Sequence, residues 1–381
     1  MMTESKRGDS LAEAPAQAEA RTELDALRAE IDAVDRHILD LLNDRAAIVQ
    51  RVGEFKREAA TSVYRSARER DLVASLAATN PGPFPNAALP HVFREIVSAT
   101  RSLETRLRVA YLGPAGTFSH IAAVDTFGSQ TDLLPLSTIP EVFEAVERGT
   151  ADHGLVPVEN TSEGVITVTL DTFVDSDVPI CGETLLRVSH DLLSRSGNLE
   201  DVRRVVSHPQ PLAQCRGWLD RHLPGVERLA LASTATAAQE AEADPATAAI
   251  GSAMLGELVG LKACASAIED RRDNTTRFLV IGGESPEPSG QDLTSVIFTV
   301  RKAQAGALHG LLEPFSEHGV NLLSIQSRPL RGAPWEYLFF IDLEGHQSEA
   351  SVQRALRSAA EVASSSHVLG SFPRAGRRSE S

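Results

Sequence analysis

The sequence predicts a multidomain chain in which an all-α segment is followed by an α/β segment and then by a small α+β segment. Three patterns support this order. Apolar residues recur at steps of three and four from Thr22 to Glu58, short apolar runs alternate with helical runs after Arg108, and residues 293–372 follow the order strand, helix, strand, strand, helix, strand. A chain of 381 residues can bury several independent cores, so separate domains are expected.

Net charge and hydropathy argue against two classes of protein. Lys and Arg total 37 against 52 Asp and Glu, which gives a formal net charge of -15. Without a basic surface, no nucleic-acid partner is predicted. The most apolar long stretch, residues 246–268, contains Glu257 and Lys262, so no membrane span is predicted. The N-terminus also lacks the basic start and apolar run of a signal peptide.

The three cysteines point to a reducing environment. Cys181, Cys215 and Cys264 form no close pair and show no metal-ligand spacing. The sequence therefore predicts no disulfide, no metal site and a cytoplasmic location.

Chain breakers and composition divide the sequence into domains. Residues 1–20 are rich in Ala, Glu and Ser without a periodic apolar face, and they are expected to form a disordered tail. Pro- and Gly-rich linkers are expected at 79–86, within the first segment, and at 283–291. The predicted domains span residues 21–106, 107–284 and 292–373.

The first domain is predicted to be helical and dimeric. From Thr22 to Glu58 there is no proline, and Gly53 is the only glycine, so one helix of roughly 50 Å is expected. Shorter helices are predicted near 65–78 and 87–105. Three helices of such unequal length favour interwoven helices of two subunits over a monomeric bundle. The seam of the long helix consists of Leu24, Leu27, Ile31, Val34, Ile38, Leu41, Arg45, Ile48, Val52 and Phe55.

Arg45 is the exception on this apolar seam. A buried cation without a partner costs several kcal/mol, so an anion should meet it. That anion is either a ligand or an acidic side chain of a neighbouring helix. Lys56, the single lysine in an Arg-rich segment, is a second candidate for ligand binding, although a solvated lysine would look the same.

The run from Leu27 to Leu72 resembles the all-helical chorismate mutase family, because five polar residues match in register. The resemblance implies an intertwined helical dimer in which Arg28, contributed by the partner subunit, and Arg45 hold the two carboxylates of chorismate. Lys56 would donate to the ether oxygen, and Glu69 would accept from the ring hydroxyl. Some relatives have Asp at position 65, but they use its backbone amide, so Arg65 is expected to have little effect. The implied site consists of Arg28, Arg45, Lys56, Arg68, Glu69, Thr100 and Glu104.

The chemistry implied by this resemblance suits a cationic site. Conversion of chorismate to prephenate is a pericyclic rearrangement that needs neither a nucleophile nor a base. A site accelerates it by holding a compact conformer and by stabilising charge on the breaking ether oxygen. Arginine forks bind carboxylates through paired hydrogen bonds. Arg45, Lys56 and Glu104 are the residues implied to act in catalysis, with Glu104 facing the ether oxygen.

The second domain is predicted to be α/β. Its expected strands are followed by loops rich in Gly, Ser, Thr and Asn, which either bind anions or cap helices. Ser207 and His208 are neighbours on one strand and point to opposite faces, so a Ser–His pair is not expected. His120 and His208 are interpreted as structural. The loops are GPAGTFSH (113–120), ENTSEG (159–164), SHPQP (207–211) and STAT (233–236).

These loops, together with NTTRF at 274–278, resemble prephenate dehydratase over residues 108–283. The resemblance implies a two-lobed, periplasmic-binding-protein-like fold with a cleft site and no cofactor. Thr276 would be the catalytic residue that assists departure of hydroxide from prephenate. A threonine hydroxyl does so only if neighbours aid its acidity, and the sequence does not identify those neighbours. The implied binding residues are Asn160, Thr161, Ser207, Gln214 and Arg277, with Arg277 holding a substrate carboxylate.

The third domain has the ferredoxin-like order and resembles the ACT regulatory domain over about 80 residues. Its GAL and SRP motifs match the phenylalanine-binding motifs of domains found beside prephenate dehydratases. The resemblance implies pairing across a dimer with L-phenylalanine at the joint. Gln326 departs from the Glu that relatives commonly carry, which affects the expected strength or specificity of feedback. The implied effector residues are Gly306, Ala307, Leu308, Gln326, Ser327, Arg328 and Pro329.

The leading hypothesis is therefore a bifunctional enzyme that converts chorismate to prephenate and then to phenylpyruvate, with feedback by L-phenylalanine. One alternative is a non-catalytic amino-acid sensor, against which Thr276 and the cationic set of the first domain argue. Another is a dehydratase whose helical domain serves only for dimerisation. Assays of phenylpyruvate formation and of chorismate consumption distinguish the three.

Overall fold

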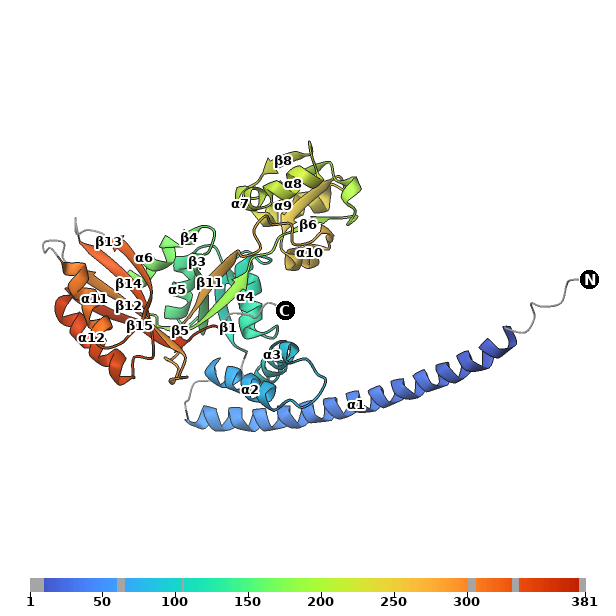
Figure 1. Ribbon diagram of the computed structural model, residues 1–381, viewed down its shortest axis with the longest axis horizontal. Helices are drawn as coiled ribbons and strands as arrows, with labels where there is room; N and C mark the ends of the chain where they lie inside the picture. The colour runs from blue at the N-terminus through green and yellow to red at the C-terminus, as the bar shows by residue number, and fades with distance from the viewer. Residues whose placement is uncertain (1–9, 60–65, 105, 301–305, 331–335, 377–381) are drawn as a thin grey trace, which may run out of the picture. The chain divides into compact units, whose positions relative to one another are not determined.

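The computed structural model describes residues 10–59, 66–104, 106–300, 306–330 and 336–376. It forms two units, one with the long first helix and residues 103–104, and one with the remaining described residues. Figure 1 labels most of the helices and strands. Within the described residues, no helix combines the length and apolarity that crossing a membrane requires.

The first unit is built on α1 (Ser10–Ala59), the long helix that the sequence predicts. Its start at Ser10 differs from the disordered tail expected for residues 1–20, since residues 10–20 are helical. Ala and Glu are strong helix formers, so this part extends the helix without an apolar face. The apolar seam is exposed along the helix of the single chain, with Leu27 at 51% and Phe55 at 73%.

Two further helices, α2 (Ser66–Thr79) and α3 (Leu89–Arg101), belong to the second unit, with the short η1 (Asn86–Ala88) between them. Helix α3 docks on the middle domain through hydrogen bonds. Buried Arg101 donates from Nη2 to the carbonyl of Phe127 at 2.6 Å, and Ser98 Oγ accepts from the amide of Gln130 at 3.2 Å. This helix is therefore attached to the α/β domain that follows it.

The first lobe of the α/β domain surrounds a mixed sheet in the order β2-β1-β3-β11-β5, with β4 paired to β3. Strands β1 to β3 are parallel, whereas β11 lies antiparallel between β3 and β5. The strands are β1 (Arg108–Leu112), β2 (Asp132–Leu136), β3 (His153–Asn160), β4 (Gly164–Val165), β5 (Ile180–Arg187) and β11 (Thr275–Ile281). The helices are α4 (Phe118–Phe127), α5 (Ile139–Glu147) and α6 (Thr167–Asp175).

Strand β11 lies in the middle of this lobe, and its side chains alternate between two cores. Phe278 and Val280 pack in a cluster with residues of α4. Leu279 and Ile281 pack on the other face, in a cluster with residues of α5 and α6. Both faces of β11 are thus covered, as the apolar run of its sequence requires.

The second lobe is a separate sheet that the chain enters after β5 and leaves before β11. Its order is β10-β6-β9-β7-β8. The two-lobed α/β architecture is therefore confirmed. The strands are β6 (Asp191–Ser194), β7 (Arg204–Ser207), β8 (Glu227–Ala230), β9 (Thr247–Gly251) and β10 (Lys262–Ala265). The helices are η2 (Leu199–Asp201), α7 (Pro209–Gln214), α8 (Arg216–His222), α9 (Thr234–Ala243) and α10 (Ala253–Val259).

The C-terminal domain has the predicted ferredoxin-like order, with the antiparallel sheet β13-β14-β12-β15. Helices α11 and α12 cover one face of this sheet (Figure 1). The strands are β12 (Asp292–Val300), β13 (Leu322–Pro329), β14 (Tyr337–Glu344) and β15 (Ser365–Pro373), and the helices are α11 (Ala307–Glu317) and α12 (Ala350–Val362).

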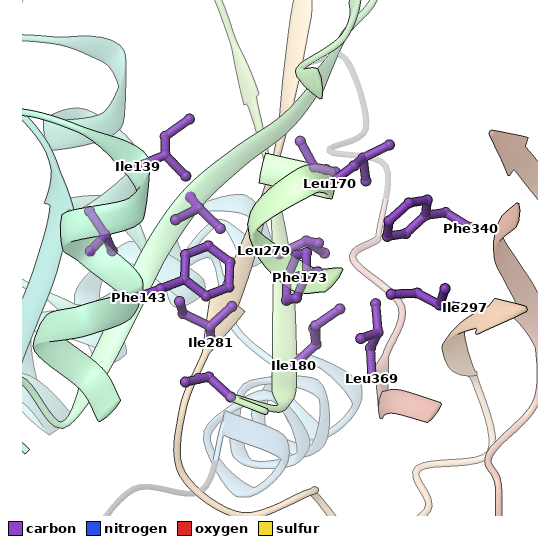
Figure 2. Packing of buried hydrophobic residues seen from close by; sticks show 14 of the residues in the cluster. Ile139, Phe143, Leu170, Phe173, Ile180, Leu279, Ile281, Ile297, Phe340 and Leu369 are labelled. Atoms are coloured by element: carbon purple, nitrogen blue, oxygen red, sulfur yellow. The ribbon is translucent and has the colours of Figure 1, made fainter. Parts of the chain in front are cut away.

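The other face of the C-terminal sheet packs against the first lobe in one continuous core. Figure 2 shows Ile297, Phe340 and Leu369 of this sheet near Leu170 and Phe173 of α6. All nine residues of β12 are buried because both faces of the sheet are covered. At Gly370 a Cβ would lie 2.1 Å from the carbonyl oxygen of Ile180, so β15 requires glycine where its backbone meets β5.

This shared core predicts a large loss of stability for Phe173→Ala. The ring is fully buried and meets Phe143 edge-on at a centroid distance of 4.8 Å. Its removal should lower the free energy of unfolding by about 3–5 kcal/mol. Val174→Ala, at a neighbouring position that is 37% exposed, should cost less than about 1 kcal/mol. Urea unfolding followed by circular dichroism measures both values. Equal losses in the two variants would contradict this packing.

Candidate active site

The side-chain amide of Asn160, at the end of β3, has a fixed orientation. Its Oδ1 accepts hydrogen bonds from the backbone amides of Ser162 at 2.9 Å and Glu163 at 3.1 Å. Backbone N–H groups can only donate, so the atom that they meet must be the oxygen. The amide nitrogen of Asn160 therefore points the other way, as a donor.

That nitrogen donates to Thr276 on the adjacent strand. Asn160 Nδ2 lies 2.8 Å from Thr276 Oγ1 and 2.9 Å from Asn274 Oδ1, and Asn160 and Thr276 are register partners of β3 and β11. All three residues are at most 9% exposed. Because Thr276 oxygen accepts this bond, its own proton remains available, and no described residue accepts it. A donor to the oxygen also favours the deprotonated form of the hydroxyl. Asn274 begins the NTTRF motif, but it is not among the site residues that the motif implies.

Thr161 connects the loop after β3 to the start of β11 through two hydrogen bonds. Its hydroxyl donates to the carbonyl of Asp273 at 3.1 Å and accepts from the amide of Thr275 at 3.0 Å. The Thr161 hydroxyl thus uses both its donor and its acceptor in hydrogen bonds with the backbone next to Thr276. In this structure Thr161 positions the loop.

Gln214, at the end of α7 in the second lobe, is held by a histidine that the sequence did not single out. His190 Nε2 lies 2.7 Å from Gln214 Oε1. Burial lowers the pKa of His190, so the ring is neutral near pH 7 and its Nε2–H serves as the donor. The amide nitrogen of Gln214 lies 3.5 Å from a carboxylate oxygen of Glu163 in the first lobe. Gln214 and Glu163 therefore lie where the two lobes meet.

The side chain of Ser207 forms a hydrogen bond with a backbone group. The side chains of His120 and His208 do the same. Ser207 is fully buried and donates to the carbonyl of Ile250 at 2.8 Å. His208 caps α7 by accepting from the amide of Gln210. His120 Nδ1 accepts from the amide of Gly116 at 3.1 Å, and its ring stacks on Tyr111. These contacts agree with structural roles for both histidines.

Three of the four polar loops cap helices. Thr117, His208 and Ser233 are the N-cap residues of α4, α7 and α9. The first loop also joins the lobes, because Ser252 Oγ donates to the carbonyl of Gly116 at 2.8 Å. The capping alternative thus applies to most of these loops, whereas the loop after β3 carries Asn160.

Arg277 is not brought together with Asn160 and Thr276. It follows Thr276 on a strand and therefore points to the opposite face. Its Nε lies 2.7 Å from Glu183 of β5, and its Nη1 lies 2.5 Å from Asp342 of the C-terminal sheet. Burial lowers the pKa of Arg277, but the two carboxylates outweigh it, so the net shift is upward and the guanidinium stays charged. A substrate carboxylate beside Thr276 would not meet this side chain in the described arrangement.

Four of the seven residues implied for the helical site have side chains that the structure describes. Arg28 is exposed and pairs with Asp25 at 3.2 Å, whereas Arg45 is half-buried on α1. Glu104 packs against α1, since a Cβ at Gly53 would lie 2.7 Å from its Cγ. Thr100 is buried and its hydroxyl donates to the carbonyl of Ile96 at 2.8 Å. Lys56, Arg68 and Glu69 lie outside the residues whose side chains are described.

The residues implied for the effector site lie on α11 and β13. Gly306 has a positive φ of 83° and directly precedes the helix, followed by Ala307 and Leu308 in its first turn. Along β13 the residues alternate, with Gln326 and Arg328 half-buried and Ser327 and Pro329 exposed. Arg328 forms a bidentate pair with Asp171 of α6, with both Nη2–O distances at 2.8 Å. Gln326 lines a cavity of about 30 Å³ between the C-terminal sheet and the first lobe.

Three family profiles match the chain in the predicted order. Chorismate mutase type II matches residues 27–105, prephenate dehydratase matches 109–286, and the ACT domain matches 294–361. Together they cover most of the chain and coincide with the helical, two-lobed and ferredoxin-like parts.

Individual relatives share this organisation over nearly the full length. The bifunctional chorismate mutase/prephenate dehydratase of Aquifex aeolicus is 45% identical over 357 residues, which are 93% of this chain and 98% of the relative. The Escherichia coli K12 protein of the same name is 31% identical over 368 residues, 91% of this chain and 95% of the relative. The solved structure of prephenate dehydratase from Arthrobacter aurescens in complex with L-Phe is 35% identical, with a TM-score of 0.65, covering 71% of this chain and 90% of that one. The chain belongs to the bifunctional chorismate mutase/prephenate dehydratase family.

Proposed function

We propose that this bifunctional enzyme carries out its dehydratase reaction through the Asn160–Thr276 hydrogen bond and works as a cytoplasmic homodimer. The chain rearranges chorismate to prephenate and then converts prephenate to phenylpyruvate. The buried Asn160 amide carries the proposal for the second reaction, because its fixed polarity leaves the Thr276 proton available.

In the dehydratase step, the electrons of the carbon–carboxylate bond move into the ring as carbon dioxide leaves. The ring becomes aromatic as the bond to its hydroxyl group breaks. Thr276 donates its proton to the departing oxygen, which leaves as water, and later regains a proton from solvent. Asn160 stabilises the negative charge that grows on Thr276 Oγ1, and Asn274 holds the Asn160 amide in place.

Gln214 presents its amide to prephenate from the second lobe, held by neutral His190. Thr161 and Ser207 hold the loops that carry these groups through their bonds to the backbone. The substrate contacts therefore come from both lobes, so closure of one lobe on the other would exclude water from the reacting ring.

The mutase site requires a second copy of the chain. The apolar seam of α1 is exposed along the described helix, and a second subunit is the occupant that would cover it. In that dimer Arg28 of one chain and Arg45 of the other hold the carboxylates of chorismate, while Lys56 and Glu104 face the ether oxygen. Arg68, Glu69 and Thr100 complete the site. A location in the cytoplasm is supported by three free cysteines.

L-phenylalanine is proposed to bind at residues 306–308 and 326–329 and to slow the dehydratase. Gly306 is exposed in the single chain, as are Ser327 and Pro329 on β13, whereas Gln326 and Arg328 are half-buried. Inhibition then follows from a higher affinity of the effector for the less active of two states.

The Thr276→Val variant tests the dehydratase proposal. It keeps the shape of the side chain and removes the donor, so dehydratase kcat should fall by about 100-fold or more while KM changes little. Thr275→Val, at the adjacent position on the other face of β11, is the matched control. Acid-triggered phenylpyruvate absorbance after addition of prephenate measures both. Dehydratase kcat within threefold of wild type in Thr276→Val would place the proton donor elsewhere.

The Arg45→Ala variant tests the mutase proposal. Loss of a carboxylate-binding fork should reduce chorismate consumption by about 100-fold and leave the dehydratase unchanged. Arg36→Ala removes an exposed arginine from the same helix and should leave both activities near wild type. A mutase rate within threefold of wild type in Arg45→Ala, with α1 intact by circular dichroism, would exclude Arg45 from carboxylate binding.

A further inference from the structure

The strand that carries Thr276 is tied to the regulatory domain by a buried cluster of three charges, defined here as Arg277, Glu183 and Asp342. Glu183 has a side chain that is 4% exposed, and those of Arg277 and Asp342 are 16% exposed. Glu183 lies on β5, the outer neighbour of β11, whereas Asp342 lies on β14 of the ACT domain. One guanidinium thus joins two strands of different domains.

Both carboxylates are held in place by further hydrogen bonds. Ser295 of β12 donates its hydroxyl to Asp342 Oδ1 at 2.5 Å, and the amide of Ala375 donates to Glu183 Oε1 at 2.7 Å. The cluster is therefore well oriented rather than a loose surface contact. Removing one charge from such a cluster leaves the others buried without compensation, which is costly.

One member of the cluster, Arg277, lies on β11 directly beside Thr276. Arg277 follows Thr276, and the pairing of β11 with β3 shifts register immediately after Arg277. A bulge of this kind adjusts where neighbouring side chains point. Because adjacent residues share one backbone, a pull on the Arg277 side chain changes the position of Thr276 Oγ1 relative to Asn160.

Asp342 of the cluster lies on β14, the strand that pairs with β13 and its effector motif. Strand β14 pairs with β13, with Asp342 opposite Ser324 and Phe340 opposite Gln326. Ser324 and Gln326 line the 30 Å³ cavity together with Arg277 and Asp342. The remaining guanidinium nitrogen, Arg277 Nη2, is buried without a hydrogen-bond partner among the described residues. A small movement of β13 can therefore offer this nitrogen a new acceptor, the Gln326 amide oxygen.

We propose that Arg277 is a positioning residue for Thr276 and that the cluster with Glu183 and Asp342 couples the ACT domain to dehydratase turnover. The coupling to L-phenylalanine rests on the function proposed above. One state has Arg277 shared by Glu183 and Asp342, with Thr276 aligned on Asn160. In the other state, a moved β13 draws Arg277 toward Gln326 and shifts Thr276 out of line.

Another ion pair between described residues of these domains, Arg328 with Asp171, lacks this connection. Arg328 of β13 binds Asp171 on α6, which carries no residue of the dehydratase site. That pair contributes to the attachment of the ACT domain. The Arg277 cluster is distinguished by its place on the catalytic strand.

The experiment compares Asp342→Asn and Glu183→Gln with Glu344→Gln in the full chain. Glu344 lies two residues after Asp342 on the same strand and pairs with Arg374 instead of Arg277. Dehydratase kcat and KM are measured without and with saturating L-phenylalanine, and binding of L-phenylalanine is measured separately by calorimetry.

In the two cluster variants, kcat without effector should fall about tenfold with KM within twofold, because Thr276 is misplaced while the substrate contacts remain. The ratio of uninhibited to inhibited rate should shrink by about fivefold or more, while L-phenylalanine still binds. Glu344→Gln should keep wild-type kcat and inhibition. A merely structural role would lower stability without separating kcat from KM or effector binding from inhibition.

Wild-type kcat and inhibition ratio in both cluster variants would overturn the proposal, as would equal losses in Glu344→Gln. If either cluster variant does not fold, Ser295→Ala replaces it, since it removes only the hydroxyl that orients Asp342, and it should show the same pattern at smaller size. If wild-type enzyme neither binds nor responds to L-phenylalanine, the proposed feedback fails, and the kcat change alone then decides the positioning role of Arg277.

Discussion

The structure depends on the alternation of side chains along β11. Thr276 faces Asn160, and Arg277, the next residue, faces the ACT domain. Leu279 and Ile281 continue the Arg277 side into the core that joins the two domains, while Phe278 and Val280 continue the other side. A single strand, buried on both faces, therefore sets the geometry of the catalytic hydroxyl and the contact with the regulatory sheet.

This constraint explains why polar groups are tolerated at the centre of a buried sheet. The Asn160 amide is satisfied by two backbone donors and two side-chain acceptors, so its burial is compensated. Arg277 is compensated by two carboxylates, which keep it charged. Shifting β11 by one residue would exchange these two environments and bury each group against the wrong partners.

The order of domains, the helical seam and the ferredoxin-like topology could be predicted from the sequence, because periodicity and chain breakers are local signals. Several strands of the two lobes are not among the expected ones, namely β2, β4, β5, β6, β9 and β10. Gly182 and Glu183 interrupt the apolar run of β5, and β9 (TAAIG) is poor in β-branched residues. Thr276 and Asn160 were found through loop motifs. The ion pairs of Arg277 could not be predicted from the sequence, because its partners Glu183 and Asp342 are 94 and 65 positions away. His190 carries no sequence signal, as its contact with Gln214 arises only in the folded second lobe.

Hydrogen exchange of the backbone amides in full-length enzyme, with and without saturating L-phenylalanine, tests most directly whether β11 transmits the effector signal. The account predicts that exchange in residues 275–281 changes together with exchange in 322–329, and that the change in β11 disappears in Asp342→Asn although β13 still responds. Altered exchange confined to β13 and α11 in the wild type, with β11 unaffected, would contradict it.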